Sequence, residues 1–425
     1  MSGKLEKIEV NYRNKKRYRT DYVPIKQPRF FTWLIMVLCN ILLIGKKVKI
    51  EKRGMDQLKG KNFFALSNHM EFIDFIITGK ALYPHRVTNV CDVLACFRIF
   101  FLIRLIGSIT TRRYVNNIKL VQVILKCLKK GRNVVMYPEA KYNASGITSA
   151  IPLSVAKLVK IAKVPLVTIK HQGNHIHKPF WNFRKLRKIP LHTIVEYTLT
   201  PEQIEKMSVE EIDQVIREKI SFNEYEYIKE NGILIKEKYR AEKLHKILYK
   251  CPHCGKEHMD SKGTEIFCLE CGKRWNFNED GTLSALEGEH YFTDIPSWYL
   301  WEKEEVRKEV RNGTYVYEDE VEVYGFPRFW RFIRLGKAKV RHTIEEGFVI
   351  EGTYRKKPYR IIKGPIEAET LHVEYDFLHI KPHDCFDITY ENDSYYCFTG
   401  KRNVLTKLNF AVEEIYALHR ERIGK

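Results

Sequence analysis

The sequence has none of the marks of a secreted or membrane-spanning protein. No secretory signal opens it, because residues 1–29 are polar and basic and the first apolar run begins only at Phe30. That run, residues 30–45, would reach about 24 Å as a helix, short of the roughly 30 Å hydrocarbon core of a bilayer. Internal repeats and low-complexity tracts are absent as well. We therefore expect a globular protein of the reducing cytoplasm.

Acidic residues are scarce relative to basic ones. The 425 residues include 73 Lys and Arg but only 52 Asp and Glu, which gives a formal net charge of +21. Such an excess implies an anionic partner, and composition alone does not choose among nucleic acid, an acidic lipid surface and a phosphorylated substrate. With 44% hydrophobic and 29% charged residues the chain is globular, and its length suits two or three domains.

Two apolar stretches are candidates for membrane contact. Basic segments at 13–19 and 46–53 flank the 30–45 run, which suits a helix embedded in one leaflet beside anionic headgroups. A buried core helix is the alternative. The second stretch, residues 95–107, carries Arg98 and Arg104 and fits either a membrane surface or an ordinary amphipathic helix. We expect a peripheral or monotopic protein at the cytoplasmic face of the cell membrane.

The first half of the chain alternates short apolar strands with helical segments. Strands are predicted at 47–54, 62–68, 86–93, 132–138, 164–170 and 191–198, and helices at 116–131 and 149–163. This order predicts an α/β fold in which a mixed sheet with flanking helices carries its chemistry on loops at the strand ends.

The remainder of the chain divides by composition. The expected segments are a basic N-terminal segment (1–29), a membrane-associated helix (30–45), an α/β domain (46–200), a helical linker (201–248), a cysteine-rich segment (249–285) and a β-rich C-terminal domain with a terminal helix (286–425). Antiparallel strands followed by one closing helix resemble, in outline only, a pleckstrin-homology-like barrel.

One polar pair stands where an apolar strand gives way to an apolar helix. In the stretch SNHMEFIDF, residues 67–75, Asp74 follows His69 by five residues. The carboxylate would keep one ring nitrogen of the imidazole protonated and leave the other free to take a proton from a hydroxyl. A packed histidine beside a capping aspartate is the alternative.

Three further motifs follow in order, and together they resemble the glycerolipid acyltransferases, which include the 1-acyl-glycerol-3-phosphate acyltransferases. Asn68, His69 and Asp74 fit the family's Asn-His-x4-Asp block. Gly107 and Arg113 fit its Gly-x5-Arg block. Pro138, Glu139 and Gly146 fit its third block, Phe-Pro-Glu-Gly-Thr-Arg-Ser, and Val164 and Pro165 fit its apolar Val-Pro strand. The resemblance covers roughly residues 30–200 and implies that 46–200 is an acyltransferase domain.

The third block departs from the family pattern. Where the family has Gly-Thr-Arg-Ser, this chain has Ala140 to Asn143, so a bidentate arginine is replaced by Tyr142 with Lys141 beside it. The resemblance then favours Arg113, with Arg112 second, as the ligand of the acceptor's phosphate, and a solvated turn is the alternative. Glu139 would orient the edge of the site or simply brace its loop.

The resemblance implies acyl transfer from acyl-CoA or an acyl-carrier protein to the hydroxyl of a lysophospholipid, with 1-acyl-glycerol-3-phosphate as the expected acceptor and phosphatidate as the product. His69 would act as the base and Asp74 would steady its imidazolium. No Gly-x-Ser-x-Gly elbow appears, which agrees with direct transfer. Substrate contacts would come from Gly107, Arg112, Arg113, Glu139 and Lys141.

Four cysteines have the spacing of a metal site. Cys251, Cys254, Cys268 and Cys271 form two Cys-x2-Cys pairs, each followed by a glycine. Doubled knuckles of this kind resemble a zinc ribbon, in which four thiolates hold a structural Zn²⁺ and leave no open position for a substrate. Redox dithiols are the alternative.

Two rival functions stay open. A zinc ribbon together with a charge of +21 also suits a nucleic-acid-binding protein, although many basic residues lie outside the ribbon and a nucleic-acid partner is the less favoured reading. The second rival is an acyltransferase fold that acts on a different acceptor or has lost activity with its altered third block.

Overall fold

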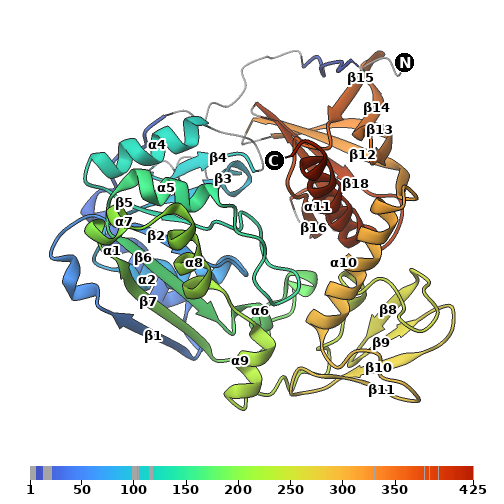
Figure 1. The fold of residues 1–425 in the computed structure, drawn as a ribbon, viewed down its shortest axis with the longest axis horizontal. Helices are drawn as coiled ribbons and strands as arrows, with labels where there is room; N and C mark the ends of the chain where they lie inside the picture. The colour runs from blue at the N-terminus through green and yellow to red at the C-terminus, as the bar shows by residue number, and fades with distance from the viewer. Residues whose placement is uncertain are drawn as a thin grey trace.

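A mixed β-sheet forms the centre of the N-terminal domain (Figure 1). The computed structural model describes residues 6–12, 22–97, 103, 105–113, 118–328, 331–377, 379–381, 383–390 and 392–424. The sheet runs in the order β1 (Val48–Arg53), β7 (Leu191–Leu199), β6 (Leu166–Gln172), β2 (Phe64–Ser67), β5 (Asn133–Met136), β3 (Val87–Asp92) and β4 (Ile109–Thr111). Neighbouring strands are parallel except β6 and β7. The predicted mixed sheet is confirmed, and β4 is an additional strand that the sequence did not predict.

Helices cover the sheet on both sides. They are α1 (Arg29–Leu42), α2 (Phe72–Leu82), α4 (Ile118–Lys129), α5 (Ser154–Ala162), α6 (Asn174–His177), α7 (Pro201–Lys206), α8 (Val209–Ile220) and α9 (Glu224–Glu230). In α8 the side chains of Ile212, Ile216 and Ile220 recur every four residues and are fully buried with α5 in one hydrophobic cluster. This stripe of α8, within the predicted helical linker 201–248, therefore packs with the core of the N-terminal domain.

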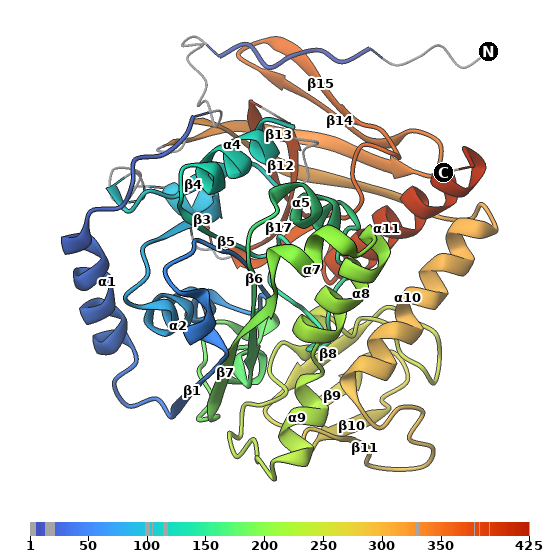
Figure 2. The same cartoon turned by 60° about the vertical axis from the view of Figure 1, so that its left-hand side comes forward.

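Helix α1 lies at the outer edge of the molecule (Figure 2). Cys39 and Leu43 pack against Ile73 and Ile77 of α2. The opposite side of the helix exposes large apolar side chains, namely Phe30, Trp33, Leu38, Ile41 and Leu42. None of the helices in the described residues is long and apolar enough to cross a membrane. Arg98, Arg104 and the basic stretch 13–19 lie outside the described residues.

The cysteine-rich segment and the C-terminal domain are built of antiparallel strands. The former has the order β11 (Leu283–Ala285), β10 (Arg274–Phe277), β9 (Glu265–Cys268) and β8 (Met259–Lys262). The latter has the order β15 (Lys357–Lys363), β14 (Gly347–Tyr354), β13 (Arg331–Thr343), β12 (Val316–Arg328), β18 (Asp393–Phe398), β17 (His383–Tyr390) and β16 (His372–Phe377). Two helices, α10 (Ile295–Arg311) and α11 (Leu405–Arg422), pack side by side next to this sheet. The predicted β-rich domain with a terminal helix is confirmed.

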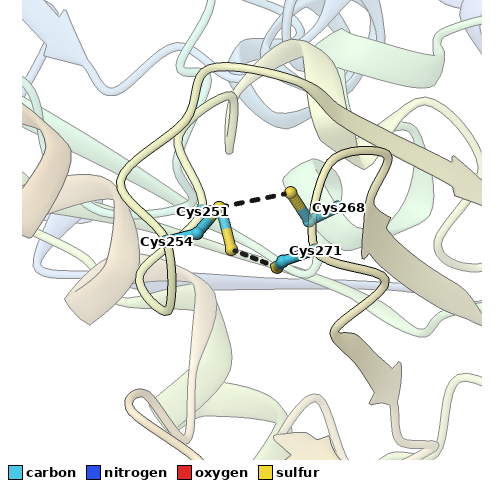
Figure 3. Close-up of side chains that lie close together, drawn as sticks. All are labelled: Cys251, Cys254, Cys268 and Cys271. Atoms are coloured by element: carbon cyan, nitrogen blue, oxygen red, sulfur yellow. Dashed lines mark hydrogen bonds between the residues drawn. The ribbon is translucent and has the colours of Figure 1, made fainter.

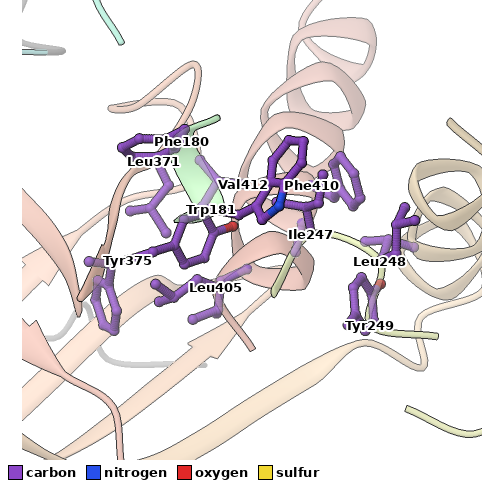
Figure 4. Packing of buried hydrophobic residues seen from close by; sticks show 14 of the residues in the cluster. Phe180, Trp181, Ile247, Leu248, Tyr249, Leu371, Tyr375, Leu405, Phe410 and Val412 are labelled. Atoms are coloured by element: carbon purple, nitrogen blue, oxygen red, sulfur yellow. The ribbon is translucent and has the colours of Figure 1, made fainter. Parts of the chain in front are cut away.

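The two large domains share one hydrophobic core. Phe180 and Trp181, which follow the N-terminal domain's strand β6, lie in the same buried cluster as Tyr375, Leu405 and Phe410 of the C-terminal domain (Figure 4). Each fully buried side chain of this size contributes about 1.5–3 kcal/mol. The C-terminal domain is therefore held firmly against the edge of the sheet at which the predicted catalytic residues lie.

Candidate active site

The turn between β2 and α2 is fixed by its neighbour in the sheet. The Asn68 side-chain amide donates to the carbonyl oxygen of His171 at 2.9 Å, and its oxygen accepts from the N–H of His171 at 2.8 Å. His171 belongs to β6, which pairs with β2 in parallel. These two hydrogen bonds hold His69, the next residue, at the carboxyl end of β2.

His69 and Asp74 are in direct contact. The imidazole Nδ1 lies 3.0 Å from Asp74 Oδ2. The same carboxylate oxygen accepts the N–H groups of Met70 at 2.5 Å and Glu71 at 3.0 Å, and Oδ1 accepts from Asn174 Nδ2 at 2.6 Å. Burial alone would raise the pKa of Asp74, but the hydrogen bond from His69 and the neighbouring donors outweigh it and hold the pKa below its ordinary value. Asp74 is therefore an anion, and the hydrogen bond assigns the proton to His69 Nδ1.

The other ring nitrogen of His69 is free to act on a substrate. Among the described residues none is hydrogen-bonded to Nε2, and 18% of the side chain is exposed. The rings of Tyr137 and Tyr142 lie 4.3 and 4.6 Å from the imidazole, centroid to centroid. Tyr142, at the position where the family motif has arginine, therefore contacts the candidate base directly.

Glu139 supports the loop that carries His69. Its carboxylate accepts the N–H of His69 at 3.3 Å and that of Ser149 at 3.0 Å. Burial raises the pKa of Glu139, and these two backbone donors offset part of that rise. Gly146, in the same loop, has a φ of +81°, and a Cβ there would lie 2.7 Å from the ring of Tyr225. The geometry therefore gives Glu139 a bracing contact behind the imidazole.

Arg113 is surrounded by acceptors from both domains. Its Nε lies 3.2 Å from Asp92 Oδ2 at the end of β3, and its Nη1 lies 3.8 Å from Glu374 Oε1 and contacts His372, both on β16. Burial opposes the charge of Arg113, but the two carboxylates raise its pKa above the ordinary value. Arg113 is thus a half-buried, neutralised cation.

The remaining predicted substrate contacts also face other parts of the chain. Arg112 is buried and donates to Ser394 Oγ at 2.7 Å and to the carbonyl of Phe326 at 3.1 Å. Lys141 donates to Thr370 at 2.8 Å and to Glu413 at 3.1 Å. Gly107 has a φ of +72°, and a Cβ there would lie 2.5 Å from the carbonyl oxygen of Ile25, so its close approach to the 25–27 segment requires glycine.

The structure brings together His69, Asp74 and Glu139, and it adds residues that the motifs did not indicate. Asn174 completes the ligands of Asp74, and Glu224 of α9 anchors the loop of Asn174 by accepting the N–H groups of Gly173 at 2.9 Å and His175 at 3.2 Å. Asn174 could have been found from the predicted topology, because a residue that follows a strand parallel to β2 lies at the same edge of the sheet as His69.

The four predicted metal ligands form a second site far along the chain. Their sulfur atoms all lie within 4.8 Å of one another (Figure 3). Cys251 Sγ is 3.7 Å from Cys271 Sγ, and Cys254 Sγ is 3.7 Å from Cys268 Sγ. A tetrahedron with Zn–S bonds of about 2.3 Å has edges of about 3.8 Å, whereas a disulfide needs about 2.05 Å. The four thiols therefore fit a closed tetrahedral zinc site.

Comparison with known proteins gives one assignment. The family model described as Acyltransferase matches residues 49–172, which include the turn of His69 and Asp74. No curated protein matches the chain.

Two solved structures are similar to parts of the chain. The 1-acyl-sn-glycerophosphate (LPA) acyltransferase PlsC from Thermotoga maritima is 12% identical, with 44% of this chain and 78% of that chain covered and a TM-score of 0.37. A structure of Vav1 inhibited by an allosteric inhibitor is 9% identical, with 26% and 28% covered and a TM-score of 0.16. Both likenesses are too distant to carry an argument about function. The family model does carry one: residues 49–172 match an acyltransferase domain.

Proposed function

We propose that this protein transfers a fatty acyl group from the thioester of acyl-CoA or acyl-carrier protein to a hydroxyl of a lysophospholipid. The observation that carries the proposal is the hydrogen bond of 3.0 Å between His69 Nδ1 and the anionic Asp74, which leaves Nε2 as an exposed base. The family match supplies the reaction class, and the donor and acceptor follow from the family resemblance.

The proposed reaction is a single displacement. His69 Nε2 takes the proton of the acceptor hydroxyl while the hydroxyl oxygen attacks the thioester carbonyl carbon. The carbon–sulfur bond then breaks, the electron pair leaves with the sulfur, and the proton passes from the imidazolium to the thiolate. Asp74 stabilises the imidazolium in between, and its own ligands keep it from moving.

The charges around the site support a proposal for the acceptor headgroup. The sequence predicts 1-acyl-glycerol-3-phosphate, whose phosphate monoester needs free cations. Here the carboxylates of Asp92 and Glu374 neutralise Arg113, and Lys141 pairs with Glu413, which also pairs with Lys303. Because a dianion would be repelled by these carboxylates, the charges favour a lysolipid whose phosphate is a diester with one negative charge. Lysophosphatidate remains the reference acceptor for the test.

The surface of the protein supports a position at the membrane. We propose that the exposed apolar side of α1 enters one leaflet at the cytoplasmic face of the cell membrane, as a peripheral or monotopic contact. Phe72, 57% exposed at the start of α2, lies three residues after His69 and would extend this contact to the active site. The acyl chains of both substrates would then reach the base from the bilayer.

An acceptor screen tests the proposal. Purified protein is incubated with acyl-CoA and, in parallel, with lysophosphatidate, lysophosphatidylglycerol, lysophosphatidylethanolamine, lysophosphatidylcholine and glycerol-3-phosphate, and thiol release is followed. The expected result is transfer to at least one lysolipid, with phosphodiester acceptors ahead of lysophosphatidate. Absence of transfer to every acceptor, with acyl-CoA and with acyl-carrier protein as donors, would remove the proposal.

A further inference from the structure

A cavity lies on the opposite side of the N-terminal domain from His69. It has a volume of about 540 Å³ and is formed by the segment before α1, the end of α2 and the starts of β3 and β5. Four cations line it, namely Lys26, Arg29, Arg86 and Arg132, and no carboxylate of the described residues does. A hollow with this lining has a positive potential and attracts anions.

These cations differ from the ones beside the active site. Arg113 and Lys141 each lie next to a carboxylate. Within the described part of the chain, none of the four cavity cations lies within 4.0 Å of one. Arg132 donates to the main-chain carbonyl of Pro24 at 2.6 Å, and Arg86 to that of Gln27 at 3.5 Å, both in the segment before α1.

The cavity also holds an unsatisfied polar group. Gln27 lines it, is 5% exposed, and has a buried Oε1 with no hydrogen-bond partner in the described residues. An amide can present its oxygen to a hydroxyl or, turned over, its NH₂ group to an anion. The first turn of α1 adds backbone N–H groups that no side chain caps, since the residue at the N-cap is Pro28. A ligand with phosphate and hydroxyl oxygens would satisfy all of these groups.

The cavity is distinct from the active site. Strands β2, β5 and β3 are parallel, so the loops of His69 and Glu139 at their carboxyl ends lie at one edge of the sheet, while Arg86 and Arg132 precede β3 and β5 at the other. Helix α2 spans the distance between the two edges, and its 11 residues measure about 16 Å.

Its position next to α1 indicates where a ligand would come from. Trp33 of α1 lines the cavity and is 49% exposed, and the ring of Phe30 lies 5.8 Å from it and is 62% exposed. The mouth of the cavity therefore adjoins the apolar side of α1 that we place in the membrane. Aromatic side chains next to cations are typical of the headgroup region of a bilayer.

From these observations we infer that the cavity binds the phosphate group of an anionic membrane lipid, and thereby holds α1 and the neighbouring active site at the bilayer. The lipid bound here is not a substrate of the acyl transfer, so this site goes beyond the proposed reaction.

The test compares the full-length protein with matched double variants in vesicle sedimentation. Arg86→Gln/Arg132→Gln removes two cavity charges, and Lys26→Gln/Arg29→Gln removes two that make no described hydrogen bond, so that a folding defect in the first leaves the second informative. Lys236→Gln/Lys238→Gln removes two exposed charges elsewhere as the control. Vesicles of phosphatidylcholine with 20% phosphatidate or phosphatidylglycerol are compared with pure phosphatidylcholine.

We expect each folded cavity variant to lose at least tenfold more affinity for the anionic vesicles than the control variant does. Equal losses in all variants would show general charge attraction and overturn the site. A second experiment measures the binding of two soluble anions, inorganic phosphate and glycerol-3-phosphate. Binding is followed by the change in tryptophan fluorescence, with Trp33→Phe as the reference that lacks the signal of Trp33. Tight binding of these soluble anions with no difference between variants on vesicles would overturn the lipid assignment. Acyl transfer to lysolipid in detergent reports the proposed function separately, and we expect the cavity variants to retain it.

Discussion

Replacing Asp74 by asparagine separates the charge of the candidate dyad from its shape. The side chain accepts four hydrogen bonds, from His69 Nδ1, Asn174 Nδ2 and the N–H groups of Met70 and Glu71. An asparagine of the same size has one oxygen, which can take the place of Oδ2, and Asn174 can turn its own amide over to match the new NH₂ group. The geometry therefore survives in Asp74→Asn, while the negative charge beside the imidazole is lost.

The size of the effect follows from that charge. Charge-assisted hydrogen bonds contribute about 1.5–3 kcal/mol and neutral ones about 1, so we expect a stability loss of about 1–3 kcal/mol. General-base catalysis is worth about 10²–10⁴ in rate, and without the anion the imidazolium that forms in the transition state is unsupported. We expect kcat to fall by about 10³, which corresponds to about 4 kcal/mol in the barrier.

The assay is thiol release from acyl-CoA with the best lysolipid acceptor, and thermal unfolding monitors the fold. Asp56→Asn, the same substitution at an exposed position of the N-terminal domain, is the matched control and is expected to keep full activity. A folded Asp74→Asn protein with kcat within threefold of the original would refute the role of Asp74 as the group that supports the base.

Three other predictions follow from the structure. The protein is expected to bind one zinc ion per chain, as measured by elemental analysis. The variant Cys251→Ser/Cys254→Ser should lose the zinc and unfold at a Tm several degrees lower. A native protein without zinc would contradict the metal site. Burial would raise the pKa of Glu413, but two lysines hold this pKa at about 2. The ionised carboxylate therefore stabilises the folded protein above the ordinary glutamate pKa of about 4.5, and this contribution is lost as the pH falls toward 2. Glu413→Gln should therefore lower the unfolding free energy by about 2–3 kcal/mol at pH 7 and by much less at pH 3, and an equal loss at both pH values would contradict the ion pair. Glu374→Gln removes one of the carboxylates beside Arg113 and is expected to lower the KM for lysophosphatidate about tenfold relative to a phosphodiester lysolipid, while an unchanged ratio would exclude Glu374 from acceptor selection.

Local pattern was enough to predict the centre of the site. His69 and Asp74 belong to one turn, so their spacing in the sequence already determines that they meet. The β-strands that carry the site are short but apolar and were predicted close to their observed bounds. In contrast, β4 has three residues, too few to show an alternation of apolar and polar side chains.

The surroundings of Arg113 could not be predicted in the same way. Its partner Glu374 is more than 250 positions away and reaches it only because the C-terminal domain packs on the N-terminal domain through a shared core. Charge patterns show where cations are, but not which of them tertiary packing neutralises. The packing of α8 could not be predicted for a related reason, since polar residues dominate its composition while its stripe of isoleucines is buried.

The most direct test of the central claim is the activity of His69→Ala on the acceptor that the original protein uses best. The account predicts a folded protein in which acyl transfer from acyl-CoA falls by at least 10³, because the imidazole that is hydrogen-bonded to Asp74 and exposes its other ring nitrogen is lost. A folded His69→Ala protein that transfers the acyl group at the original rate would contradict the assignment of His69 as the base.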